Sequence, residues 1–200
     1  MTGIPYISAA ELRNRILRAL ERPRRVLDRP DLVRSAVLVP VVLDGPEPAV
    51  VFTRRTMTVA KHKGQISFPG GAAEPGDEGP VATALREARE EIGLDPAVVD
   101  VAGVLDDQIT TTGFLITPVV GLLPVDSCFA SDPFEVAEVF GVPWSVLTDP
   151  ARHDIEELEW RGMSFRNHRY HTGDKVIWGA TGRILARFIE AVEPSNGTAT

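Results

Sequence analysis

The stretch that most constrains this chain is residues 64–94, GQISFPGGAAEPGDEGPVATALREAREEIGL, in which a glycine- and proline-rich loop leads into a helical pattern. Pro80 suits the first turn of a helix, and Gly93 suits the position just after the last turn. We therefore predict a helix over residues 80–92, with a short strand and a loop in front of it.

This predicted helix has two different faces. At 100° per residue its apolar side chains form one stripe, composed of Val81, Leu85, Ala88 and Ile92. Glu87, Glu90 and Glu91 gather on another face, where like charges destabilise a helix by about a few tenths of a kcal/mol per pair. Such a face needs free solvation or a cation, and Mg²⁺ is commonly held by one or two carboxylates together with substrate phosphates. Both interpretations are open from the helix alone.

The loop and helix together resemble the Nudix box, G-x5-E-x7-R-E-U-x-E-E-x-G-U with U aliphatic, which favours the cation. The matching residues are Gly71, Glu78, Arg86, Glu87, Ala88, Glu90, Glu91, Gly93 and Leu94. The register is complete from Glu78 onward. Upstream, six residues rather than five separate Gly71 from Glu78, and Ala72 stands at the formal glycine position.

The segment before the box resembles the coenzyme A diphosphatase branch of the Nudix hydrolases, which carries L-L-T-x-R-S-x3-R-x3-G-x3-F-P-G-G. The matching residues are Val51, Phe52, Thr53, Arg55, Thr56, Gly64, Phe68, Pro69, Gly70 and Gly71. Ala60 stands where the run has arginine, and Lys61 and Lys63 are the candidates to replace it.

The resemblance implies a metal site on the helix. Glu87 and Glu91 are the expected principal ligands of Mg²⁺ or Mn²⁺, with the Gly71 carbonyl completing the shell. Glu90 is expected to act as a further ligand or as the base that activates water, so Glu90 and Glu87 are the catalytic candidates. Arg86 is expected to pair with Glu78 or another loop carboxylate, with a phosphate contact as the alternative.

The resemblance also implies a substrate, coenzyme A or a derivative, split at its diphosphate into 3′,5′-ADP and 4′-phosphopantetheine or its acyl form. The expected substrate-binding residues are Arg54, Arg55, Lys61, Lys63, Gly70, Thr112 and Phe114. Two alternatives are a Nudix hydrolase of ADP-ribose, NADH or another nucleoside diphosphate derivative, and a Nudix module that binds its ligand without cleaving it. The three glutamates in one turn weigh against the second.

Charge and composition argue against two other classes of protein, those that bind nucleic acids and those that associate with membranes. The net charge of −7 argues against a nucleic-acid-binding protein. No apolar run approaches the roughly 20 residues that span a bilayer, so no membrane association is expected. Cys128 is the single cysteine, which is compatible with a reducing compartment, and we expect a cytoplasmic protein. Homodimers are common among Nudix proteins, and a homodimer is left open here.

The rest of the chain predicts an α+β fold, which the resemblance specifies as the Nudix α/β/α sandwich with a mixed sheet between helices. Further helices are expected over residues 8–20, 144–147 and 180–192. Strands are expected over residues 33–43, 49–54, 65–68, 98–105, 114–123, 134–140, 157–170 and 175–178. Pro40 suggests an edge position or a bulge in the first strand. We expect an N-terminal helix and basic connector over residues 1–30, the Nudix domain over residues 31–192, and a flexible tail over residues 193–200.

Several residues remain open between a site and a structural role. Glu135 and Glu138 lie where some Nudix enzymes have a late metal ligand or base, and surface positions are favoured for both. Tyr170, Phe114 and Trp178 are aromatic rings that could stack on adenine, and a core position is favoured for Trp178. The loop over residues 110–113 is interpreted either as a substrate loop or as a polar turn.

Overall fold

The computed structural model describes residues 7–56, 64–160 and 163–193, which form two sheets and four α-helices. The larger sheet contains β1 (Val33–Val42), β2 (Ala49–Arg55), β3 (Ile66–Ser67), β4 (Gly70–Ala72), β5 (Asp100–Val104), β6 (Gln108–Ile109), β7 (Phe114–Leu123) and β8 (Val136–Pro143). The smaller sheet contains β9 (His153–Trp160), β10 (Met163–Thr172) and β11 (Lys175–Ile177). The helices are α1 (Ala9–Leu20), α2 (Pro80–Ile92), α3 (Trp144–Leu147) and α4 (Gly179–Val192), and the 3₁₀ turns are Pro96–Val98 and Pro150–Arg152.

The larger sheet is mixed, and β1 and β7 form its centre. These two strands run parallel over their whole length, from Val33 opposite Phe114 to Val42 opposite Leu123. The other strand pairs are antiparallel, and the main order is β3-β2-β1-β7-β5. Both central strands are covered on their two faces, which explains their nearly continuous apolar sequences.

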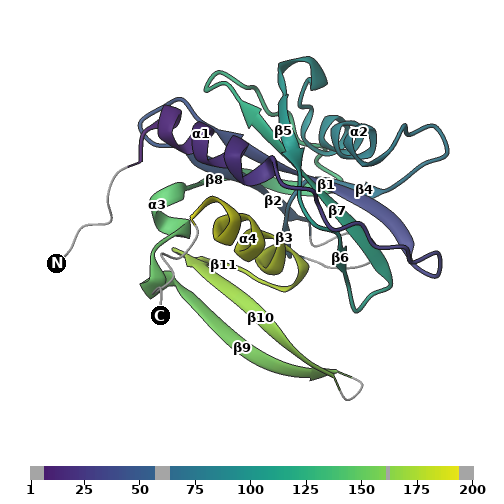
Figure 1. The fold of residues 1–200 in the computed structure, drawn as a ribbon. Coiled ribbons are helices and arrows are strands. Elements are labelled where there is room, and N and C mark those ends of the chain that lie inside the picture. Colours follow the sequence, from purple (N-terminus) through teal and green to yellow (C-terminus); the bar gives the residue numbers. More distant parts are fainter. Residues whose placement is uncertain (1–6, 57–63, 161–162, 194–200) are drawn as a thin grey trace.

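Helices cover both faces of this sheet (Figure 1). Successive side chains of a strand point to opposite faces. In β1, Ala36 and Leu38 therefore pack with Ala88 of α2, whereas Val39 and Val41 pack in a second core with α1 and α4. The structure is thus an α/β/α sandwich with a mixed sheet, as the sequence predicts.

The N-terminal helix belongs to this packing. The Ser8 hydroxyl caps it by accepting a hydrogen bond from the Glu11 N–H at 3.2 Å, and Leu12 and Ile16 are fully buried beside α4. The boundaries at residues 30 and 192 remain predictions. Of the predicted tail, only Glu193 lies within the described residues, and it pairs with Arg15. In the part of the chain described here, no helix has the length and apolar content to cross a bilayer.

Two predictions about strands are wrong. The single strand expected over residues 157–170 is part of a hairpin, in which β9 ends at Trp160 and β10 begins at Met163. Both halves alternate with the same period, so the pattern does not mark the reversal. Pro40 does not lie at an edge, because β1 is central, and it does not form a bulge against β7, because the register of that pair continues through Pro40 without a shift. It lies between the part of β1 that pairs with β4 and the part that pairs with β2, where its missing N–H is tolerated.

Candidate active site

The acidic helix begins and ends where the sequence predicts. Gly79 precedes it with a φ of 92°, Pro80 occupies its first turn, and Gly93 ends it in the left-handed conformation with a φ of 64°. The Gly93 N–H donates to the Arg89 carbonyl at 3.0 Å. Ala88 and Ile92 anchor the helix against the sheet, because both are buried. Local caps therefore set the ends of the helix, and packing against the sheet sets the position of its glutamates.

Glu91 is the buried member of the acidic face, with only 6% of the residue exposed. One carboxylate oxygen accepts a hydrogen bond from the Gly70 N–H at 3.2 Å, and the other lies 3.4 Å from an Arg55 guanidinium nitrogen. Burial raises the pKa of Glu91 to about 7, and the negative charges of Glu87 and Glu135 act in the same direction. One arginine at this distance does not offset the cost of burying the charge.

Glu87 lies directly against Gly71. A Cβ atom at position 71 would come within 2.5 Å of the Glu87 carboxyl carbon, so the absence of a side chain at Gly71 leaves room for the carboxylate. The Arg86 guanidinium donates to Glu87 at 2.9 Å. Burial nevertheless raises the pKa of Glu87 above its ordinary value.

Glu90 has a different environment from the other two glutamates. Its side chain is 59% exposed, and it accepts a hydrogen bond from Arg86 at 3.1 Å. Of the three, it is the one most accessible to water.

Arg86 fastens the loop to the helix through Asp77. Its Nε and Nη2 donate to the two Asp77 carboxylate oxygens, each at 3.1 Å, and Nη2 also donates to the Ala72 carbonyl at 2.9 Å. Asp77 also accepts hydrogen bonds from the Thr83 hydroxyl and the Glu74 N–H, both at 2.9 Å. The loop carboxylate that is hydrogen-bonded to Arg86 is thus Asp77, and the Glu74 carboxylate lies 3.9 Å from the same guanidinium.

The residues around Gly71 have the chemistry of a divalent-cation site. Within residues 7–56, 64–160 and 163–193, no three His, Cys, Asp or Glu side chains converge into a complete metal cage. Mg²⁺ does not require one, because it usually keeps several waters and takes further oxygens from a substrate. Glu87 and Glu91 offer hard anionic oxygens whose mutual repulsion is incompletely neutralised. These residues fit a bound Mg²⁺ or Mn²⁺.

A pocket of about 830 Å³ opens next to this acidic face. Gly70, Gly71, Arg55 and Glu135 line one part of it, and Arg55 also contacts Glu91. Its volume is within the range of small-molecule sites. The pocket and the acidic helix therefore border each other.

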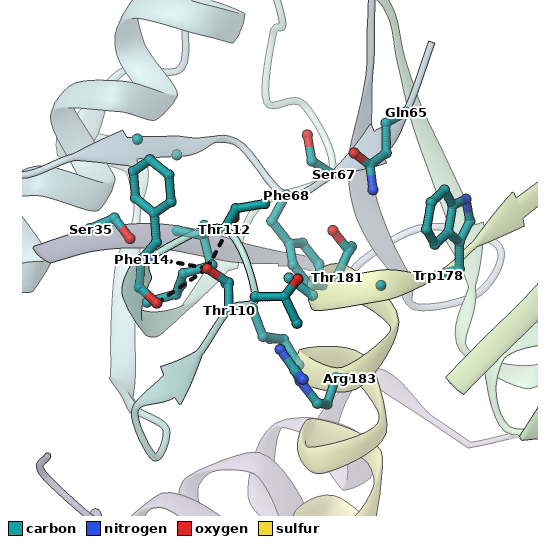
Figure 2. A pocket seen from close by; sticks show the side chains of 18 of the residues that line it. Ser35, Gln65, Ser67, Phe68, Thr110, Thr112, Phe114, Trp178, Thr181 and Arg183 are labelled. Atoms are coloured by element: carbon teal, nitrogen blue, oxygen red, sulfur yellow. Dashed lines mark hydrogen bonds between the residues drawn. The ribbon is translucent and has the colours of Figure 1, made fainter. Parts of the chain in front are cut away.

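The expected substrate residues divide into three groups. Arg55, Gly70, Thr112 and Phe114 line the pocket, and Figure 2 shows the last two there. Arg54 is not among the lining residues, and it pairs with Glu138 at 3.2 Å. Lys61 and Lys63 lie outside the described residues, as does Ala60.

The loop over residues 110–113 is an ordered part of the pocket wall. The Thr110 hydroxyl accepts a hydrogen bond from the Phe114 N–H at 2.9 Å and lies 3.1 Å from the Thr112 hydroxyl (Figure 2). Thr110, Thr111 and Thr112 all line the pocket. Of the two interpretations of this loop, its position agrees with the substrate loop.

The expectation of a core position for Trp178 is wrong. Trp178 is 47% exposed and lines the pocket, on the side away from Phe114 in Figure 2. Tyr170 is the buried ring, at 3% exposure, and stacks on His153. The Trp178 ring remains accessible because it immediately precedes α4, where the chain turns from β11 into the helix.

The surface position favoured for Glu135 is confirmed, since its side chain is 51% exposed, but sequence reasoning did not find the contribution of the C-terminal third of the chain. Glu135 lines the pocket, and its carboxylate lies 3.8 Å from Arg55. Phe165 and Arg166 of β10 and Arg183 of α4 line the same pocket. No motif spacing could have found these three, because only the packing of β10 and α4 against the main sheet brings them there.

Comparison with known proteins agrees with this geometry. The Nudix domain family matches residues 32–165. A protein of Photorhabdus laumondii named "Uncharacterized Nudix hydrolase NudL" is 37% identical over 188 residues, covering 94% of this chain and 99% of the relative. A protein of the same name from Cronobacter sakazakii is 40% identical over 164 residues, covering 78% and 85%.

A solved structure supports the fold. The MutT/nudix family protein from Enterococcus faecalis superposes with a TM-score of 0.54 over 94% of this chain and 75% of that one, at 13% identity. With the box, the sandwich and these relatives in agreement, the chain belongs to the Nudix family and is a hydrolase of the diphosphatase type.

Proposed function

We propose that this Nudix hydrolase cleaves the diphosphate of coenzyme A or of its derivatives, releasing 3′,5′-ADP and 4′-phosphopantetheine or its acyl form. The observation that carries the proposal is the junction at Gly70 and Gly71, where the two motifs of the sequence meet. The branch motif ends there, and the same glycines contact the Nudix-box glutamates and line the pocket.

Glu87 and Glu91, with the Gly71 carbonyl and Glu90, would hold Mg²⁺ or Mn²⁺. A bound cation supplies neutralisation of charge on the phosphoryl oxygens and a more acidic water. Glu90 is assigned either as a further ligand or as the base that takes the proton of the attacking water, with Glu87 as the second candidate. The exposure of Glu90 supports the assignment as base, since a base must reach that water.

Positive side chains and loop residues would hold the substrate. Arg55 lies between Glu91 and the pocket, where its remaining N–H groups suit a phosphate oxygen. Further phosphate contacts are proposed for Arg54, Lys61 and Lys63, which lie close to Arg55 in the sequence. Gly70 allows close approach of the backbone, and Thr112 and Phe114 supply hydroxyl and ring contacts to the rest of the molecule.

Chromatographic product analysis tests this proposal. Purified protein is incubated separately with coenzyme A, ADP-ribose and NADH, with Mg²⁺ or Mn²⁺ and with chelator, alongside Glu91→Gln. We expect coenzyme A to be cleaved fastest, to yield 3′,5′-ADP, to require metal, and to be lost in the variant. Faster cleavage of ADP-ribose or NADH would keep the Nudix chemistry and reject the coenzyme A assignment. Binding without turnover of any diphosphate would favour a non-catalytic module.

The predicted surroundings of the enzyme complete the proposal. A cytoplasmic location suits a chain with one exposed free cysteine, Cys128. The homodimer remains a prediction, which the mass in solution by light scattering tests.

A further inference from the structure

Arg183 has an environment that the hydrolysis of a diphosphate does not explain. It lies in the first half of α4 and lines the pocket, extending toward the Thr110–Thr112 loop in Figure 2. Its Nη2 donates to the Ile109 carbonyl at 2.8 Å, which fixes the guanidinium in place. Its Nε is buried and has no hydrogen-bond partner. Within the described residues, it forms no ion pair.

Other partly buried arginines of this protein differ from Arg183, because they pair with carboxylates. Arg24, Arg55 and Arg86 have side chains 27%, 26% and 21% exposed, and each pairs with a buried carboxylate, of Asp107, Glu91 and Asp77 respectively. Desolvation lowers the pKa of Arg183, and no neighbouring carboxylate opposes that effect. An arginine keeps its charge in proteins, so its buried donor without an acceptor is a cost that a bound anion would remove.

The surroundings of Arg183 in the pocket are rich in hydrogen-bond donors. Arg166 of β10, an exposed residue, lines the same pocket and a second cavity, and within the described residues it forms no ion pair, although Glu157 lies opposite it in the strand register. The first turn of α4, Gly179 to Thr181, also lines the pocket, and there the Gly179 N–H donates to the Asn167 side-chain oxygen at 3.0 Å. The pocket carboxylate Glu135 is close to Arg55 instead.

Arg183 also borders a second cavity, of about 610 Å³, on the side of α4 and the β9–β10 hairpin. Three carboxylates line that cavity, and each pairs with another arginine: Asp149 with Arg152, Glu190 with Arg187, and Glu193 with Arg15. Within the described residues no carboxylate thus pairs with Arg183, and a ligand in the larger pocket, where the substrate is proposed to bind, can supply the missing acceptor.

We propose that Arg183, assisted by Arg166, binds a phosphomonoester group that the substrate carries in addition to its scissile diphosphate. The planar fork of a guanidinium matches the oxygens of a phosphate. This inference rests on the proposed function, under which that group is the 3′-phosphate of coenzyme A. Arg183 would then be a specificity-determining residue that distinguishes 3′-phosphorylated substrates from their 3′-hydroxyl counterparts.

The test compares two substrates that differ only in this group, coenzyme A and 3′-dephospho-coenzyme A. The wild-type protein is expected to prefer coenzyme A in kcat/KM. Arg183→Gln is expected to lower kcat/KM for coenzyme A by about 10- to 100-fold, the range of a charge-assisted hydrogen bond, and to leave dephospho-coenzyme A nearly unchanged. Arg183→Lys keeps the charge but not the planar fork of the guanidinium. Its kcat/KM for coenzyme A should lie between those of the wild type and Arg183→Gln.

Arg187→Gln is the matched control, because Arg187 is one turn further along α4, exposed, and paired with Glu190. It should keep the wild-type substrate preference.

Binding provides a second readout that is independent of turnover and of metal. In chelator, calorimetric titration of the wild-type protein should give tighter binding of 3′,5′-ADP than of 5′-AMP, and this result holds even where Arg183→Gln folds poorly.

The two proposals fail differently. The role of Arg183 would be overturned if Arg183→Gln lowered kcat/KM equally for coenzyme A and dephospho-coenzyme A. It would also be overturned if the wild type bound 3′,5′-ADP and 5′-AMP equally. Both results would leave the coenzyme A assignment intact. If the wild type cleaves neither coenzyme but cleaves NADH, the proposed function fails. The pair NADPH and NADH, which also differ by one phosphomonoester, then tests Arg183. A wild-type preference for NADPH over NADH that is lost in Arg183→Gln would support the role of Arg183. If the wild type showed no such preference, that role would be overturned.

Discussion

At the scale of single residues, the acidic face is not a uniform surface. Glu91 is buried against Gly70, Glu87 lies against Gly71, and Glu90 is exposed beside Arg86. Three glutamates of one turn thus have three different environments. The difference comes from the glycine-rich loop, which places Gly70 against Glu91 and Gly71 against Glu87 and leaves Glu90 uncovered.

The contact between Gly71 and Glu87 gives a prediction about activity. Gly71→Ala should lower the metal-dependent turnover by about 10- to 100-fold, because the added Cβ displaces a carboxylate that must be accurately placed. The melting temperature should change little, because the atoms that must move are at the end of a flexible side chain. Kinetics and thermal melting of the same sample check both parts.

Gly76→Ala serves as the control for this prediction. Gly76 lies in the same loop, and a Cβ there would meet no atom within 4 Å. It should therefore keep wild-type turnover. Equal losses in the two variants would show that the loop as a whole, rather than the Gly71–Glu87 contact, is responsible.

The Arg86 network predicts which loop carboxylate stabilises the protein. Asp77→Asn should lower the midpoint of urea unfolding, because the Asp77 side chain, 7% exposed, receives both arms of Arg86. The guanidinium holds the pKa of Asp77 well below its usual range, so the stabilising charge is present at neutral pH. Glu78→Gln should have a smaller effect on the midpoint, since Glu78 is exposed. A larger effect of Glu78→Gln would restore Glu78 as the partner.

At the scale of elements, strong local signals gave accurate predictions. The helix Pro80–Ile92 and the strand Phe114–Leu123 begin and end where expected, as does the short helix Trp144–Leu147. The first is bounded by proline and glycine. The hairpin of β9 and β10 was not predicted, because the side-chain alternation is the same in both strands and does not mark where the chain reverses.

The β9–β10 hairpin carries a pair of histidines with a predictable pH dependence. His153 Nε2 and His168 Nδ1 lie 3.0 Å apart, and Tyr170 stacks on His153. Burial lowers the pKa of both histidines, and the carboxylates of Glu190 and, for His153, Asp154 oppose this only partly. The folded protein therefore resists protonation at this pair.

The sign of the effect follows from linkage. The unfolded chain binds protons at the ordinary histidine pKa of about 6.5, above that of the folded pair, so stability is lost as the pH falls below that value. Glu91, whose raised pKa is about 7, has the opposite pH dependence, so the pair is isolated by comparison with a variant that has glutamine at positions 153 and 168. Between pH 7.5 and pH 5.5 the melting temperature of the wild-type protein should fall relative to that of this variant. An equal fall in the variant would assign the effect to other groups.

At the scale of the whole molecule, the site is assembled from both sheets and two helices. The acidic face comes from α2, the glycines from β4, and Arg55 from β2. Phe165 and Arg166 come from β10, and Arg183 comes from α4, on the face of the sheet opposite α2 (Figure 1). The pocket thus reaches from the proposed metal site into the C-terminal third of the chain.

The sequence by itself determined the acidic helix, its caps, the Nudix box and the fold class, because these depend on neighbours within a few turns and on fixed spacings. Only the tertiary structure decided that Asp77 rather than Glu78 pairs with Arg86, that Trp178 is accessible, and that Arg183 lies in the pocket. The Arg183 guanidinium meets the Ile109 carbonyl across 74 residues of sequence. Such contacts follow from how sheets and helices pack, and packing is a property of the whole chain.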